Sequence, residues 1–236
     1  MDILTKMKSV FVGMLIIPMI TIADDNVINI TQSGDNLDLE IEQVGFNNEV
    51  GMLDSYSYIN NAPNLDMHIV QYNNTSAINK ILFDEISGSG NTLKLGQGIA
   101  WQGDGSYTYD SIEGGGHYME LDLYGNDNSL TWHQTNAGST SGHDFNFHLA
   151  GDDNDISGRQ QGNGVKEMNL TIYNSDNNVT ARQKGTWANH TANITLDGLY
   201  GTDLLFKQLG STSLTYSLSV DCVTVGGCAV TVEQGN

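Results

Sequence analysis

Few side chains in this sequence combine the types and the spacing that metal binding requires. Its six histidines are scattered at positions 68, 117, 133, 143, 148 and 190. His143-Asp144 with His148 is the one cluster that hints at a metal, and it stands beside a Gly-Ser stretch, which is typical of a solvated loop. His68 and His133 are expected at outward strand positions. We predict that the cluster is a solvated loop and that the chain has no metal site and no cofactor.

The carboxylates and serines do not indicate an enzyme either. The acid pairs Asp152-Asp153 and Asp24-Asp25 belong to a turn and a terminus, and nothing singles out two carboxylates that could flank a glycosidic bond. The sequence has no Gly-x-Ser-x-Gly elbow, nucleotide-binding glycine loop or calcium-binding Gly-Gly-x-Gly-x-Asp repeat. Regular Thr-x-Thr arrays, as on an ice-binding face, are missing too. We predict a protein that is not an enzyme and has no catalytic residue.

The first 23 residues have the composition of a secretory signal. Lys6 and Lys8 give it a basic start, residues 10–20 are mostly apolar, and Ala23 supplies a small residue at a plausible cleavage site. The apolar run is too short to favour a membrane span, although an N-terminal anchor helix is the alternative. We therefore expect residues 1–23 to be a signal peptide and residues 24–236 to be a secreted repeat domain without a membrane span.

The net charge and the many small residues further limit the fold class and the partners that this protein could have. The chain holds 28 acidic against nine basic residues, a formal net charge of −19, and its sequence shows no basic patch. Such a chain repels nucleic acid and anionic lipid. Its 27 glycines, with many Asn, Ser, Thr and Asp residues, predict a turn-rich all-β protein. Cys222 and Cys228 flank a Gly-Gly turn, and in a secreted chain they predict one small hairpin disulfide.

A strand that ends in glutamine recurs along the chain. The glutamines at positions 43, 71, 97, 134, 160, 183, 208 and 234 lie 23 to 28 residues apart, except for one interval of 37. Two and four residues before each glutamine the side chains are apolar, as at Leu130 and Trp132 before Gln134, with Gly158 as the exception. The positions between them are mostly polar. This alternation places the apolar side chains and the glutamine on one face of a strand.

A second alternating segment precedes each glutamine strand. Leu121-x-Leu123-x-Gly125 and Ile194-x-Leu196-x-Gly198 are clear cases. Asparagines follow three residues after the closing Gly or Asn in several units, at 128, 154 and 177. Gly and Asn accept positive φ at low cost, so a tight reversal at these positions has a physical basis. One unit is therefore strand, turn, strand, turn.

Such a unit carries an apolar face that it cannot bury alone. Stacking copies at about 4.8 Å buries this face, and the inward amides then form ladders in which each rung donates to the next. A meandering sandwich or barrel is the alternative, but it does not require the same amide at the same strand position each time. We predict an all-β fold, a β-solenoid of about eight stacked strand-turn-strand repeats. Segments 51–66 and 99–118 are expected as loops, either contact surfaces or tolerated insertions.

The unit resembles the curlin repeat of curli fibre subunits. The residues that carry the resemblance are Ile28-x-Ile30-x-Gln32-x-Gly34-x-Asn36, followed by Ile41-x-Gln43-Val44-Gly45-Phe46-Asn47-Asn48. It covers nearly the whole chain after residue 23, although the period is longer and less regular than in the family, whose nonrepetitive segment after the signal is missing. The resemblance implies an amyloid-like cross-β stack. Its ladder residues would be Gln43, Gln71, Gln97, Gln134, Gln160, Gln183, Gln208 and Gln234, with Asn48, Asn91, Asn128, Asn154 and Asn177.

The resemblance also implies a function. It points to a structural subunit of an extracellular functional amyloid fibre, a curli pilus or fimbrium, in the biofilm matrix and in surface adhesion of a Gram-negative bacterium. Its partners would be further copies of itself, other curli-like subunits and an outer-membrane secretion pore. The last unit has no evident cap, which favours polymerisation. The alternative is a soluble or surface-attached adhesin that binds polysaccharide through the aromatic loop 99–118, with Trp101, Tyr107, Tyr109 and Tyr118.

Overall fold

The computed structural model describes residues 27–28, 32–33, 38–41, 43, 45, 47–52, 58–60, 65–73, 75–98, 100–101, 107–108, 114–136 and 139–235. The predicted signal peptide 1–23 lies outside these residues. The described residues form strands, bridges and turns and no helix, so the fold is all-β. No helix in this part of the chain could therefore cross a membrane.

The strands run along the chain in fifteen segments. They are β1 (Val27–Ile28), β2 (Gln32–Ser33), β3 (Asn48–Met52), β4 (Tyr58–Asn60), β5 (Asn79–Ser87), β6 (Ala100–Trp101), β7 (Tyr107–Thr108), β8 (Tyr118–Tyr124), β9 (Asp144–Asn146), β10 (Lys166–Met168), β11 (Asn178–Lys184), β12 (His190–Gly198), β13 (Thr202–Leu209), β14 (Leu214–Cys222) and β15 (Cys228–Gln234). Apart from the antiparallel pair β6–β7, every strand pairs in parallel with the strand of a neighbouring turn. Parallel pairing between successive turns makes this fold a β-solenoid.

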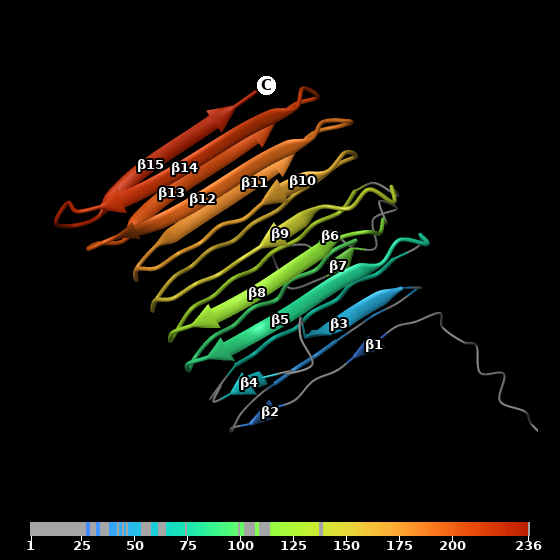
Figure 1. The fold of residues 1–236 in the computed structure, drawn as a ribbon, viewed down its shortest axis with the longest axis horizontal. Helices are drawn as coiled ribbons and strands as arrows, with labels where there is room; N and C mark the ends of the chain where they lie inside the picture. The colour runs from blue at the N-terminus through green and yellow to red at the C-terminus, as the bar shows by residue number, and fades with distance from the viewer. Residues whose placement is uncertain are drawn as a thin grey trace, which may run out of the picture.

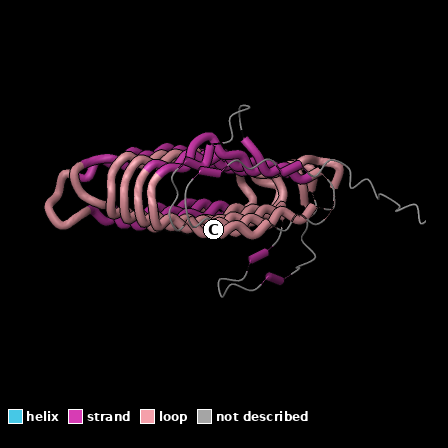
Figure 2. The backbone as a smooth tube through the Cα atoms, turned by 90° about the horizontal axis from the view of Figure 1, so that it is seen from below, coloured by secondary structure: helices cyan, strands magenta, loops and turns pink. Residues whose placement is uncertain are grey.

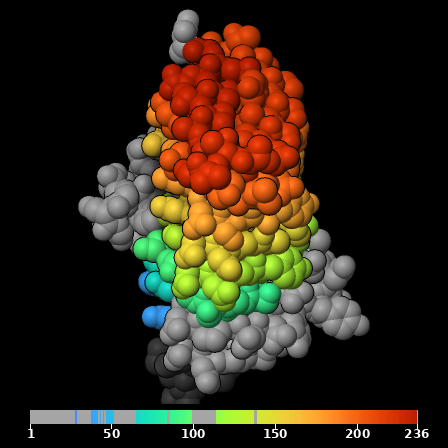
Figure 3. Space-filling model, turned by 90° about the vertical axis from the view of Figure 1, so that its left-hand side faces the viewer, coloured from blue at the N-terminus to red at the C-terminus, as the bar shows by residue number. Residues whose placement is uncertain are grey.

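Two parallel layers form the solenoid, and we call one turn through both layers a rung. The first layer stacks β1, β3, β5, β8 and β9, and continues through β10, β12 and β14 (Figure 1). The second layer runs from the bridge Asp38↔Asp66 through Thr92, Ser129 and Asp155 to β11, β13 and β15. Figure 2 shows the two layers joined by rounded turns, and Figure 3 shows the chain rising along one axis from its N-terminal to its C-terminal residues.

The core lies between the layers because both layers alternate as the sequence predicts. Burial in β8 alternates strictly, with Met119, Leu121 and Leu123 inside. The second layer contributes Leu130, Trp132 and their equivalents, and all of them belong to one continuous apolar cluster. Each fully buried side chain of this size contributes about 1.5–3 kcal/mol, so stacking the rungs is what stabilises units that cannot fold alone.

The second layer departs from the predicted strands before β11. There the rungs pair through isolated bridges, and non-glycine residues are left-handed, as at Lys94 (φ 92°), Thr131 (φ 49°) and Ser157 (φ 79°). Left-handed residues interrupt the extended backbone that a regular ladder of hydrogen bonds needs. No glycine or asparagine stands at these positions to signal the break. The prediction of a regular strand was therefore wrong for these rungs, although the alternation of burial holds.

The two predicted loops also differ from the expectation. Gly51 and Met52 lie in β3, and Tyr58–Asn60 forms β4, which pairs with the far half of β5. The described residues between 51 and 60 thus form two pieces of a first-layer strand rather than a loop, and Asp66 already belongs to the second layer. In segment 99–118, Ala100–Trp101 and Tyr107–Thr108 pair in antiparallel fashion, and Tyr118 already begins β8. Residues 53–57, 61–64, 102–106 and 109–113 lie outside the described part of the chain.

Gly158, the exception in the sequence pattern, has a packing reason. The indole of Trp132 stacks on Phe145 with ring centroids 3.6 Å apart, and this pair fills the core where a side chain at position 158 would lie. A Cβ on Gly158 would meet Trp132 Cε3 at 2.1 Å, and its φ is +155°. The large indole on one rung therefore requires a glycine on the next.

Candidate functional site

The inward glutamines form a hydrogen-bonded column along the core. Each amide Nε2 donates to the Oε1 of the glutamine on the preceding rung from Gln71 to Gln160, over 2.6–2.9 Å. Farther along, Gln183 donates to Gln208 and Gln208 to Gln234, each over 2.9 Å. The six glutamines from 71 to 208 are fully buried. A solitary buried amide would be costly, whereas the amides on either side of the Gln160–Gln183 step bond to one another along the column.

The same amides also tie the two layers together. Gln71 donates to the carbonyl oxygen of Glu49 at 2.9 Å, Gln134 to that of Tyr118 at 3.0 Å, and Gln160 to that of Asp144 at 2.6 Å. Each of these carbonyls belongs to the first layer of the same rung. The glutamine column therefore fixes both the spacing along the axis and the alignment of one layer over the other.

The predicted asparagines divide into two columns. Asn91, Asn128, Asn154 and Asn177 stack at one turn, where each Oδ1 accepts the backbone N–H of the next rung at 2.9–3.1 Å, ending at Thr202. Asn48 does not belong with them. It begins β3 in the first layer and pairs in register with Asn79 of β5, at the opposite end of the strands. Sequence spacing alone did not separate these two corners.

The corner that begins with Asn48 and Asn79 continues with basic residues, and we call it the corner column. Its further members are His117, His143, Lys166 and His190, all of them buried. The ring centroids of His117 and His143 lie 5.0 Å apart, and the backbone N–H of His143 donates to Nδ1 of His117 at 3.1 Å. Burial lowers the pKa of His117, His143 and His190, and that of His143 falls to about 3.

The hydrogen-bond acceptors of the Lys166 ammonium are backbone carbonyls and include no carboxylate among the described residues. The ammonium donates to the carbonyl oxygens of Asn163, Gly164 and Ala188 at 2.8–2.9 Å and to that of Gly162 at 3.4 Å. Burial lowers the pKa of Lys166 to about 8. The carbonyls of two neighbouring turns thus replace the solvent shell of a buried cation.

The prediction of a solvated loop around His143 was wrong, and the outward position of His133 is not an exposed one. His143 and Asp144 are not in a solvated loop, because His143 is buried in the corner column and Asp144 begins β9. His133 keeps the outward parity of its strand but is only 8% exposed, and burial, followed by the charge of Arg159, lowers its pKa to about 4. His148 does point outward, where Nδ1 lies 3.1 Å from Asp122. Among the described residues no three His, Cys, Asp or Glu side chains could hold a metal ion together.

A basic patch was missed in the sequence because its members are 23 to 26 residues apart. From Gln160 onward the residue just before the ladder glutamine lies on the outer face, and the in-register pairing places Arg182 beside Lys207. Arg159, His133 and Lys207 precede Gln160, Gln134 and Gln208, so they stand in the same column as Arg182, which we call the basic stripe. Only the alignment of the glutamines, read one position earlier, could have revealed it.

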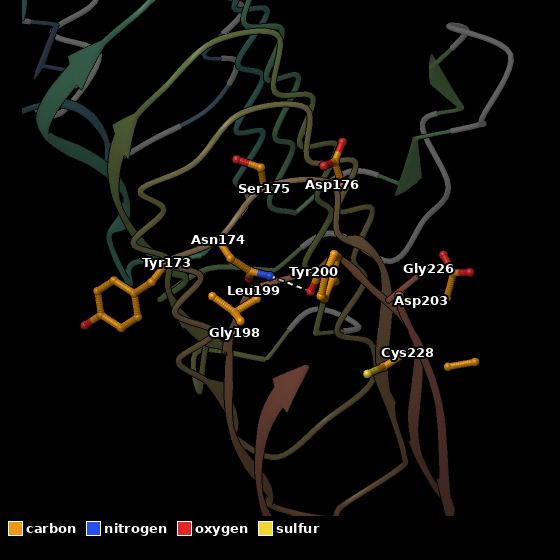
Figure 4. Close-up of a pocket in the computed structure, with 13 residues that line it drawn as sticks. Tyr173, Asn174, Ser175, Asp176, Gly198, Leu199, Tyr200, Asp203, Gly226 and Cys228 are labelled. Atoms are coloured by element: carbon orange, nitrogen blue, oxygen red, sulfur yellow. Dashed lines mark hydrogen bonds between the residues drawn. The ribbon is translucent and has the colours of Figure 1, made fainter. Parts of the chain in front are cut away.

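The predicted disulfide is present between Cys222 and Cys228, but it does not close a hairpin. It spans the turn from β14 in the first layer to β15 in the second, and these strands pair with β12 and β13 rather than with each other. Beside it, the turns 173–176, 198–201 and 226–229 line an open cleft of about 700 Å³. Figure 4 shows Asn174 directed at Tyr200, whose carbonyl it reaches at 2.9 Å, and Tyr173 pointing away from the cleft.

Comparisons of the chain with protein-family models, with curated proteins and with solved structures give no match.

Proposed function

We propose that this protein is a structural subunit of an extracellular, curli-like amyloid fibre that grows by stacking rung on rung. The observation that carries the proposal is the glutamine column, which reaches Gln234 at the C-terminal end of the solenoid. Inward side chains of the last rung, among them Leu218, Val230 and Val232, pack on the core but are only partly buried there. They form an apolar surface that a further rung of the same shape would cover.

The backbone supports the same geometry. Among the described residues, β14 pairs with β12 and β15 pairs with β13, so the outer edge of each has no partner strand. An open parallel edge presents N–H and C=O groups that template another strand. A second copy would continue the column of eight glutamines with its Gln43 above Gln234, at a rise of about 4.8 Å per rung.

Growth of the stack also requires that the glutamine amides all donate in the same direction along the axis. Gln183 and Gln208 donate toward the C-terminal end, whereas Gln160 donates toward the N-terminal end. If the amides of Gln183, Gln208 and Gln234 each turn by about 180° about their last torsion, which is soft, every rung donates in one direction. Gln234 then presents its Oε1 to the Gln43 amide of the next copy. We propose that stacking selects this uniform ladder.

The wider role follows from the curlin resemblance. It supports export with residues 1–23 as the signal, passage through an outer-membrane pore, and assembly at the cell surface of a Gram-negative bacterium, with further copies and related subunits as partners. The fibre would serve the biofilm matrix and adhesion. The excess of acidic residues would keep the exported chain soluble until salt screens the repulsion between copies.

The test is to block the open end. Val230→Glu with Val232→Glu places two charges on the last rung, where the single chain leaves these side chains partly exposed, whereas a stacked copy would bury them. The matched control is Ala229→Glu with Thr231→Glu, which adds the same charge to the outward face of the same strand. Electron microscopy and thioflavin fluorescence of residues 24–236 then report fibre growth.

We expect fibres from the control and from the unchanged protein and none from the blocked variant. A small amount of blocked variant should also halt growth of unchanged protein by occupying fibre ends. Equal fibre growth by blocked and control variants would overturn end-to-end stacking at this rung.

A further inference from the structure

The basic stripe holds like charges on adjacent rungs. Arg159 and Arg182 follow each other at the rung spacing, about 4.8 Å, and neither guanidinium has a carboxylate within 4.0 Å among the described residues. Burial, and then the charge of Arg182, lowers the pKa of Arg159. The Nε of Arg182 is buried and makes no hydrogen bond in this part of the chain. Like charges on paired strands are unfavourable unless an anion compensates them.

The opposite layer holds an equivalent pair of acids. Asp144 and Glu167 occupy adjacent rungs of the first layer, and two positions farther along both strands Asn169 donates to Asn146 at 3.0 Å, which fixes this register. Burial, and then the charge of Glu167, raises the pKa of Asp144. No lysine or arginine forms an ion pair with either acid among the described residues. Among the described residues, these acids and these arginines therefore have no ion-pair partner, and both pairs have the same rung spacing.

The two pairs lie in line across the solenoid. Gln160 points inward and donates to the carbonyl of Asp144, so Arg159, the neighbour of Gln160, faces outward directly across the core from Asp144. The bridge Gln161↔Lys184 places Arg182 one rung after Arg159, so Arg182 lies across from Glu167 in the same way. The layers they belong to are the upper and lower rows of the backbone in Figure 2, where β6 and β7 lie outside the second layer.

We propose that a second copy of this chain docks side by side on the first, with its acidic pair Asp144 and Glu167 on the basic pair Arg159 and Arg182. A translation along the normal to the layers, without rotation, brings these two pairs together. The rung after would place Thr191 opposite Lys207, so no like charges meet there. Arginine forms bidentate hydrogen bonds with carboxylates, which favours direct contact of the two pairs over a diffuse attraction between the faces.

Lateral docking does not depend on the end-to-end stacking proposed above, since it uses the faces of the solenoid and leaves its ends open. Long-range repulsion between two strongly acidic molecules opposes it, but the screening length at physiological salt is about 8 Å, and the paired charges would be in contact. Moderate salt should thus favour docking, and high salt should abolish it.

The experiment uses two complementary charge reversals. Arg159→Glu with Arg182→Glu makes both faces acidic, and Asp144→Arg with Glu167→Arg makes both faces basic. The control is Asp197→Arg with Asp221→Arg, two exposed acids on adjacent rungs of the first layer, outside the proposed contact. All are made in residues 24–236 with the end-blocking Val230→Glu and Val232→Glu changes, and lateral association is followed by sedimentation velocity, with circular dichroism as the check of folding.

The parent and the control should associate at about 0.15 M salt and separate at about 1 M, where the screening length is about 3 Å. Each reversal alone should weaken association by about tenfold or more, and an equimolar mixture of the two should restore it. Association that is unchanged in both reversals, or a mixture that stays apart, would overturn lateral docking. Because the ends are blocked, neither outcome bears on stacking; stacking without docking would appear as single unbundled fibres from the unblocked chain.

Discussion

Gln160 and Gln183 occupy adjacent rungs, and each has a buried Oε1 that accepts no hydrogen bond among the described residues. The Gln160 amide donates to Gln134 and the Gln183 amide donates to Gln208, so the ladder reverses its direction between them. Away from this reversal each ladder Oε1 accepts a hydrogen bond from a neighbouring glutamine, whereas the two Oε1 atoms at the reversal accept none. Substitutions at different rungs should therefore have different costs.

Gln134→Leu should destabilise the protein more than Gln183→Leu. Gln134 donates to Gln97 and to the Tyr118 carbonyl and accepts from Gln160, so its removal leaves buried groups unpaired. We expect a loss of about 3 kcal/mol in the free energy of unfolding, against about 1 kcal/mol for Gln183→Leu, which removes one donor and one unbonded oxygen. Urea unfolding of both variants measures the difference, and equal losses would mean that the ladder does not stabilise rung by rung.

Gly158→Ala should be disfavoured by the indole of Trp132. The new Cβ would lie 2.1 Å from the ring, and a core overpacked by one methyl group costs about 1–3 kcal/mol. Gly226→Ala is the matched control, because that glycine also has a positive φ but nothing lies within 4 Å of its Cβ position. If the contact is the cause, Trp132→Leu should recover part of the loss caused by Gly158→Ala in a double-mutant cycle of thermal unfolding.

Acid should destabilise the folded chain through its buried histidines. Their pKa values lie below the ordinary 6.5, at about 3 for His143 and about 4 for His133, so the unfolded chain binds protons that the folded chain does not. The free energy of unfolding should consequently fall as pH drops from 6.5 toward 4, by roughly 3 kcal/mol for His133 alone, since a tenfold change in proton affinity equals about 1.4 kcal/mol. Denaturant melts at a series of pH values give the slope.

A paired change isolates the corner column. Asn48 and Asn79 show that asparagine fits at this corner, so His117→Asn with His143→Asn should fold and should lose part of the acid sensitivity. Lys166 should affect the alkaline range of the curve of stability against pH. Because burial lowers its pKa to about 8, stability should rise with pH between about 8 and 10.5, and Lys166→Met should remove that rise. An acid slope identical in the histidine variant and the parent would place the sensitivity elsewhere.

The stacked architecture was predictable because it depends on residue spacing. Alternation before each glutamine determines which side chains face the core, and Gln97 and Gln134 lie in the same column although 37 residues separate them. The corner column was harder to predict from the sequence. Lys166 and His143 are charged or titratable residue types at the start of a strand, where composition favours a loop, and their burial is possible only because carbonyls and neighbouring rungs satisfy them.

Features that arise between rungs could not be predicted at all without the register. Arg159 and Arg182 are unremarkable as single outward residues, and only in-register stacking brings them together as a stripe. The left-handed residues such as Thr131 have no local signal, because the conformation is imposed by the packing of the layers and not by the residue type. The divided strand at β3 and β4 was mistaken for a loop because its insertion breaks the alternation.

The most direct test of the account is X-ray fibre diffraction of purified residues 24–236 after incubation at high concentration. Rung-on-rung stacking predicts aligned fibres with a meridional reflection near 4.7–4.8 Å, the spacing between strands along the axis. A protein that stays a monodisperse monomer for days, or fibres that lack this reflection, would contradict it.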